Sequence, residues 1–185
     1  MTPARTSATF SSPIVASRRW IDGLTFSEQM PLLNLSQAAP SEPPPEGLRQ
    51  ALADAALTQV DAHLYGAVLG RDELRAALAA QMSTHYQAQI NAAQIGISSG
   101  CNQAFAAAIA SLCGEGDEVI LPVPWYFNHK MWLDLSGAKA VPLTLDDTML
   151  PCPQKAEALI TQKTKAITLV SPNNPTGVQY PAELL

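Results

Sequence analysis

Long apolar runs and clusters of basic residues are both missing from this 185-residue chain. No apolar run is long enough to span a lipid bilayer, so we expect no membrane-spanning helix. Acidic residues outnumber basic ones by 16 to 11, which gives a net charge of −5. Because no basic patch is present to offset phosphate repulsion, we expect no nucleic-acid partner.

Cysteine is also sparse, and the three that are present, Cys101, Cys113 and Cys152, are scattered along the chain. This odd, widely spaced set fits neither a disulfide framework nor a Cys-x-x-Cys metal pair. We therefore predict no metal site and a reducing location, the cytoplasm.

What the chain does have is an ordinary globular composition, with 47% hydrophobic and 15% charged residues. A chain of this length can bury a sizeable core. Residues 1–45 are expected to form an N-terminal arm, with a short helix near 17–26 and an extended proline-rich segment at 41–45. Residues 46–185 are expected to form a larger domain.

Two helices are expected at the start of this larger domain. Apolar residues recur at helical spacing from Glu46 to about Val60, namely Leu48, Leu52, Ala55 and Ala56. Gly70 is expected to form a turn, and Asp72 to cap a helix over residues 73–85.

Residues 88–185 alternate short apolar strands with helices. We expect strands at 94–98, 118–121, 139–143 and 166–170, and helices at 102–113, 127–135 and 153–162. This rhythm is typical of βαβ units and predicts an α/β fold, a mainly parallel sheet with helices on both faces. Since right-handed crossovers bring the carboxyl ends of the strands to one edge, the loops after Ser98, Leu121 and Val170 are expected to line one crevice.

The loop after the last expected strand reads Ser171-Pro172-Asn173-Asn174-Pro175-Thr176-Gly177. Proline and glycine stop the strand and leave Asn174 at its carboxyl end, where open α/β sheets bind ligands. The Asn174 amide can donate a hydrogen bond to an anionic oxygen of a ligand. Taken alone, the tetrapeptide is explained equally well by a proline-rich turn without a ligand.

The loop after Ser98 leads through Gly100, Cys101 and Asn102 into an alanine-rich helix. Glycine lets the backbone approach a ligand closely, and the free N–H groups and dipole at a helix start attract anions such as phosphate. The alternative is a simple helix cap without a ligand.

The loop after Leu121 carries three consecutive aromatic residues, Trp125, Tyr126 and Phe127, behind a Pro-x-Pro pair. Taken alone, such a cluster is ordinary core packing. His129 lies one helical turn after Tyr126, and a structural or surface position is expected for it.

Together, these loops resemble those of the class I/II aminotransferases, which are fold-type I enzymes that use pyridoxal 5′-phosphate (PLP). Asn174-Pro175-Thr176-Gly177 matches the family motif whose asparagine faces the phenolic oxygen of the cofactor. The resemblance places Gly100, Cys101 and Asn102 in the family's phosphate cradle and makes Tyr126 the ring that stacks on the cofactor. It covers about residues 33–185.

A further segment, Tyr65-x4-Gly70-x3-Leu74-Arg75, resembles the family element whose tyrosine reaches across a dimer interface to the partner's cofactor phosphate. The resemblance therefore implies a homodimer in which Tyr65 serves the partner's site. From its own residues, Tyr65 is expected to be a half-buried aromatic with its hydroxyl at the surface. The family's Leu-x-x-Gly-x-Pro element also has a counterpart, although here Ala38 occupies the glycine position.

The resemblance implies transfer of an amino group between an L-amino acid and a 2-oxo acid. In this family the lysine that forms an imine with the cofactor follows the Asn-Pro-Thr-Gly loop. Lys139, Lys163 and Lys165 all lie where a strand begins, away from the expected ligand edge. We therefore assign no catalytic residue, and expect these 185 residues to be the cofactor-binding N-terminal part of a longer enzyme and inactive alone.

Two alternatives share the same loops. Other fold-type I enzymes, among them C–S lyases, decarboxylases and synthases, differ only in substrate-binding residues and outcome. A non-catalytic, aminotransferase-like regulatory domain is the other, and it carries a helix-turn-helix domain ahead of this region. The roughly 30 residues that precede the resemblance are too few for such a domain.

Overall fold

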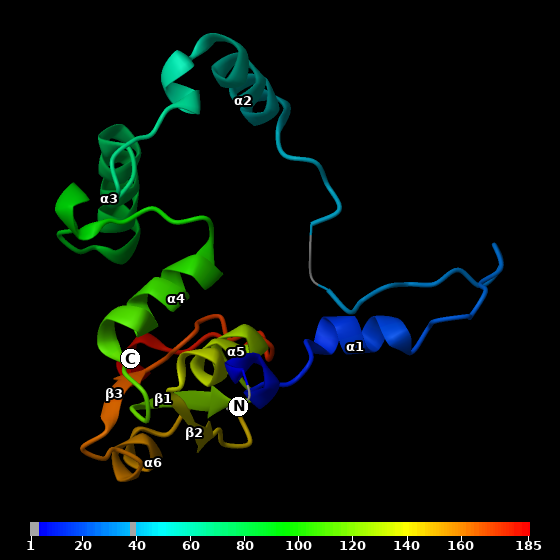
Figure 1. The fold of residues 1–185 in the computed structure, drawn as a ribbon, viewed down its shortest axis with the longest axis vertical. Coiled ribbons are helices and arrows are strands. Elements are labelled where there is room, and N and C mark those ends of the chain that lie inside the picture. The colour runs from blue at the N-terminus through cyan, green and yellow to red at the C-terminus, as the bar shows by residue number, and fades with distance from the viewer. Residues whose placement is uncertain (1–3, 38–39) are drawn as a thin grey trace. The chain divides into compact units, whose positions relative to one another are not determined.

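The computed structural model describes residues 4–37 and 40–185 (Figure 1). The chain divides into two compact units. Met1–Pro31 with Cys101–Leu185 forms the first, the sheet unit, and Leu32–Gly100 forms the second, the helical unit. The boundary expected between residues 45 and 46 falls inside the helical unit and stays a prediction. Ala38 lies outside the described residues.

The sheet unit is built on three parallel strands, β1 (Glu118–Val123), β2 (Lys139–Thr144) and β3 (Thr164–Ile167), in the order β2-β1-β3. Ile120 on the central strand lies opposite Val141 and Ile167. Valine and isoleucine favour such pairing because branched side chains pack well on a pleated surface. The expected parallel sheet is confirmed.

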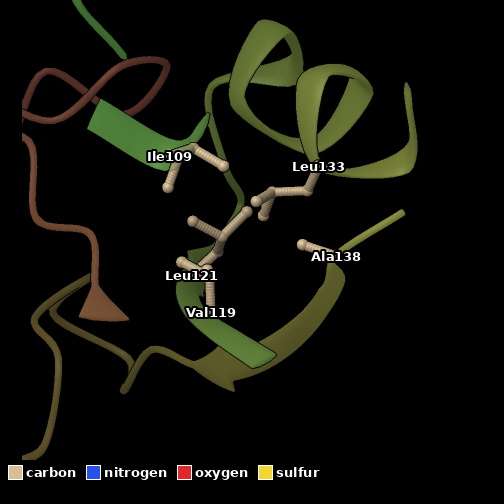
Figure 2. Packing of buried hydrophobic residues seen from close by; sticks show 5 residues of the cluster. All are labelled: Ile109, Val119, Leu121, Leu133 and Ala138. Carbon is tan, nitrogen blue, oxygen red and sulfur yellow. The ribbon is translucent and has the colours of Figure 1, made fainter. Parts of the chain in front are cut away.

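Helices cover both faces of this sheet. On one face, Ile109 of α4 (Cys101–Leu112) and Leu133 of α5 (Phe127–Ser136) pack against Val119 and Leu121 (Figure 2). On the other, α6 (Pro153–Ala158) borders an open apolar hollow together with Leu143 and Ile167. Figure 1 shows α5 and α6 on opposite sides of the strands. The arrangement expected from the sequence is therefore confirmed.

The N-terminal segment of the sheet unit contains a 3-10 turn, η1 (Arg5–Ala8), and a short helix, α1 (Pro13–Arg19). The guanidinium of Arg5 donates to the carbonyl of Ser136 at 2.8 Å and pairs with Glu115 at 2.9 Å. The helix expected near 17–26 is misplaced, because the chain starts its helix at Pro13, whose fixed φ suits a first turn.

The helical unit contains α2 (Glu46–Thr58), η2 (Val60–His63), α3 (Asp72–Tyr86) and η3 (Ala92–Gln94). Both expected helices are present, and Gly70 turns the chain with a φ of +99°. The expected cap is wrong. Arg71 holds the cap position, while Asp72 is the first helical residue and binds Arg75 at 3.1 Å.

The strand expected at 94–98 is wrong, because η3 occupies its start and the rest is irregular. The amide of Ile97 donates to the carbonyl of Leu69 at 2.9 Å, and the carbonyl of Ile95 accepts from the Arg75 side chain at 2.9 Å. A strand needs a ladder, and β-branched residues alone do not supply one.

Two further elements end early. β3 stops at Ile167, short of the expected residue 170, since it is an edge strand paired with β1 alone. α6 ends at Ala158, short of residue 162, and the amide of Thr161 donates instead to Thr164 Oγ1 at 2.9 Å. A last turn, η4, covers Ala182–Leu184. Within the described ranges, no helix has the length and apolarity to cross a membrane.

Candidate functional site

Ring contacts connect the loop after β1 to the first turns of α4. Tyr126 immediately precedes α5, and its ring meets His129 edge-on, with centroids 5.0 Å apart at 88°. His129 in turn stacks on Phe105 of α4, with centroids 3.9 Å apart at 20°. Phe105 lies about one helical turn after Cys101. Thus the expected stacking residue is linked through His129 to Phe105 of α4.

A small hollow connects the loop after β1 to the loop after β3. Its lining comprises Leu121, Pro122, Trp125, Tyr126, His129, Thr168, Val170 and Asn173. The enclosed volume is about 10 Å³, which is room for one water molecule. These two loops therefore share the carboxyl edge of the sheet.

His129 is half-buried, and this burial lowers the pKa of its imidazole below the ordinary value of 6.5. The ring is therefore neutral at neutral pH, because burial disfavours the charged form. The ring stacks on Phe105 and lines the hollow, and its structural role stays a prediction.

The Asn-Pro-Thr-Gly loop is held together by Asn173, which sequence reasoning missed. Its side-chain oxygen accepts from the backbone amide of Thr176 at 3.3 Å and from the Thr176 hydroxyl at 2.8 Å. Asn173 is 5% exposed, and its carbonyl accepts from Gly177 at 2.7 Å. The spacing Asn173-x-x-Thr176 was the available signal, since asparagine side chains bind nearby backbone groups in turns.

Asn174, the predicted ligand-binding asparagine, does not line the hollow. It lies on the exposed side of the loop, and its side-chain amide makes no hydrogen bond to any residue that the structure describes. The two neighbouring asparagines thus differ in their contacts. Asn173 holds the loop, while Asn174 presents a free donor at the carboxyl edge of the sheet.

The expected phosphate cradle falls at the boundary between the units. In the helical unit, Gly100 has a φ of +96°, and no atom lies within 4 Å of the Cβ that another residue would place there. In the sheet unit, Cys101 and Asn102 form the exposed first turn of α4. Amide N–H groups of a first helical turn have no partner within the helix, and such turns commonly bind anions.

Tyr65 is fully exposed, at 109% of its reference area, so its expected half-burial is wrong. It borders an open hollow of about 450 Å³ within the helical unit, together with Asp61, Arg71 and Glu73. The fully exposed Tyr65 side chain is therefore free to contact another molecule.

The three lysines set aside in the sequence analysis lie where the strands begin. Lys139 opens β2 and pairs with Glu118 at 3.0 Å, and Lys165 lies 3.8 Å from Asp117. The carbonyl of Lys163, just before β3, accepts from the amide of Glu118 at 2.8 Å. The hollow lies at the opposite, carboxyl edge, so the expected positions of these lysines are confirmed, while their exclusion from catalysis stays a prediction.

The cysteines and metal-binding residue types form no site in the described part of the chain. All three cysteines are free thiols. Across residues 4–37 and 40–185, no group of three His, Cys, Asp or Glu side chains is arranged to hold a metal ion.

Comparison with known proteins assigns the family. The pattern of the family described as "Aminotransferase class I and II" matches residues 30–185. An aspartate aminotransferase of Streptomyces avermitilis is 32% identical over 155 residues, covering 83% of this chain and 38% of that protein.

Solved structures agree. The aspartate aminotransferase of Thermotoga maritima superposes with a TM-score of 0.83 at 27% identity, covering 99% of this chain and 48% of that one. The Thermus thermophilus enzyme with maleate gives 0.85 at 27% identity, covering 97% and 47%. The chain thus spans less than half the length of these relatives, and it belongs to the class I and II aminotransferase family.

Proposed function

We propose that this chain forms the PLP-binding part of an aminotransferase that moves an amino group between an L-amino acid and a 2-oxo acid. The observation that carries the proposal is the shared edge, where Tyr126 and His129 from the loop and helix after β1 line one small hollow with Asn173, the residue just before the Asn-Pro-Thr-Gly motif. Family membership and the names of the aspartate aminotransferase relatives support it.

The residues at this edge fit the chemical groups of PLP. The Tyr126 ring offers a stacking surface, and the free amide of Asn174 offers a donor to the phenolic oxygen. The backbone amides of Gly100, Cys101 and Asn102, at the glycine turn and the first turn of α4, suit the phosphate. When bound, PLP supplies an electron sink for the substrate's α-carbon.

The proposal includes a homodimeric partner and a cytoplasmic location. Tyr65 is fully exposed and would reach the partner's cofactor phosphate in a homodimer. Three free, scattered cysteines suit a reducing cytoplasm. The lyase, decarboxylase and synthase alternatives share these loops, and no observation on the described residues favours them.

PLP binding to the 185-residue chain tests the proposal. Trp125 lies next to Tyr126, so PLP bound at this edge should quench tryptophan fluorescence. Tyr126→Ala should weaken PLP binding about fivefold to tenfold, because aromatic stacking contributes roughly 1 kcal/mol. Tyr86→Ala, at the exposed end of α3, is the matched control and should leave the affinity unchanged. Equal affinities for the two variants would contradict the proposal.

Turnover gives a second measurement. Because the lysines at the beginnings of the strands lie away from the hollow, we expect no transamination by these 185 residues alone, even with PLP bound. Transamination by the purified chain would contradict this expectation, but it would not contradict the proposed PLP-binding site.

A further inference from the structure

The side chain of Asn128 contacts the residue that the sequence singled out as the stacking ring. Asn128 lies in the first turn of α5, and its amide nitrogen donates to the hydroxyl oxygen of Tyr126 at 2.7 Å. Both side chains are partly buried. A neutral hydrogen bond of this length is well formed, and partial burial limits the access of water that competes for the hydroxyl.

This contact is not a helix cap. Tyr126 holds the cap position of α5 and makes no side-chain cap hydrogen bond, while the backbone amide of His129 donates to the Tyr126 carbonyl at 3.0 Å. The Asn128 side chain therefore binds the ring hydroxyl and not the free amides of the helix start.

Three contacts together fix the plane of the Tyr126 ring. The backbone at the start of α5 fixes its Cα, the edge of the ring meets His129, and Asn128 holds the hydroxyl at the far end. A tyrosine ring turns about only two side-chain torsions, so anchoring both ends leaves it little freedom. His129 is itself held by stacking on Phe105, so the anchor continues into α4.

We propose that Asn128 is a positioning residue that sets the angle of the Tyr126 ring before PLP binds. This inference rests on the proposed function. A ring held in its binding orientation loses less conformational freedom when a flat ligand stacks on it, so affinity rises without a new contact to the ligand. Tyrosine, and not phenylalanine, is therefore the aromatic residue that suits this position.

The first test uses the ligand-free chain labelled with 3-fluorotyrosine. The chain contains four tyrosines, and the ¹⁹F signal of Tyr126 is assigned by its loss in Tyr126→Phe. Asn128→Leu, which keeps the branched shape of the side chain but removes the donor, should shift the Tyr126 signal and leave the Tyr86 signal unchanged. Asn128→Asp should retain a bound hydroxyl, because the carboxylate accepts from the phenol. An unchanged Tyr126 signal in Asn128→Leu would overturn the inference.

The second test is a double-mutant cycle on PLP affinity with Tyr126→Phe, Asn128→Leu and the double variant. Each single change should weaken binding about twofold to tenfold, the effect of one neutral hydrogen bond, and the double variant should be no weaker than either single one. Asn34→Leu, at a residue in the helical unit whose side chain accepts from the nearby Ser36, is the control.

The outcomes separate the two proposals. If the unsubstituted chain does not bind PLP, the proposed function fails. If it binds PLP and Asn128→Leu binds equally well, or if the two substitutions are additive, only the positioning role of Asn128 fails.

Discussion

The two units contain similar apolar sequence patterns, yet they bury them very differently. In the sheet unit, Val119, Ile120 and Leu133 are completely buried. In the described part of the helical unit, the buried apolar residues are Ala79 and Ile95, and Leu52 on α2 is 61% exposed. A helical stripe stabilises a chain only when it packs against another element, so periodicity alone does not create a core. The loop with Tyr126 is therefore attached to a packed core, whereas Tyr65 lies between η2 and α3, whose apolar side chains are largely exposed.

The largest expected effect contrasts one leucine from each unit. Leu133→Ala removes a fully buried side chain from the core shown in Figure 2 and should lower the free energy of unfolding by about 2–5 kcal/mol. Leu52→Ala should change it by less than about 0.5 kcal/mol, because that side chain is largely exposed. Urea denaturation followed by circular dichroism measures both. Similar losses for the two variants would show that the helical unit has a core in solution.

A second contrast sharpens the comparison inside the helical unit, using two glycines with nearly equal backbone angles. Gly70 and Gly100 have φ of +99° and +96°, so alanine costs about 1–2 kcal/mol of backbone strain at either position. At Gly70 the new Cβ would also lie 2.6 Å from Ile97 Cγ1, whereas at Gly100 it meets nothing within 4 Å.

We therefore expect Gly70→Ala to loosen the contact between residues 69 and 97 more than Gly100→Ala does. Hydrogen exchange at the Ile97 amide, which donates to the Leu69 carbonyl, reports this directly. Exchange should be about tenfold faster in Gly70→Ala than in Gly100→Ala, corresponding to roughly 1.4 kcal/mol. Equal exchange would mean that Ile97 moves aside without cost.

The sequence predicted best where local pattern and tertiary environment agree. The short apolar segments of β1 and β2 form a sheet because each has a neighbouring strand. Ile95 and Ile97 have the same preference, but they form no strand, since their segment has one backbone bond to a neighbour instead of a ladder. The β-propensity of these residues carries no information on whether a neighbouring strand is present to pair with them.

At the candidate site, the motifs predicted which loops form the site better than they predicted the contacts of individual side chains. The sequence singled out Asn174, while Asn173 supplies the hydrogen bonds that shape the loop. It singled out Tyr126 and gave no sign of Asn128, because a contact between residues two apart depends on the chain turning into α5 just there. Such pairings follow from three-dimensional geometry and not from residue type.

The smallest expected effect concerns the pH dependence that His129 gives to the sheet unit. Burial lowers the pKa of His129 below 6.5 in the folded chain, so the unfolded chain binds more protons between that pKa and 6.5. The free energy of unfolding should thus be highest above pH 6.5 and should fall as the pH drops below it, with a slope under about 1.4 kcal/mol per pH unit for one proton.

Urea denaturation between pH 7.5 and 5.5 measures this slope, and His129→Phe, which can keep the stacking on Phe105, should flatten it. His85→Phe on α3 is the matched control from the open helical unit. The pH range in which His129 titrates is separate from that of Glu118. Hydrogen bonds from Thr161 and Lys139 lower the pKa of Glu118 below 4.5, so the stability that this carboxylate contributes is lost only at lower pH. A slope that survives His129→Phe but disappears in His85→Phe would assign the coupled proton to the helical unit and reverse the contrast between the two regions.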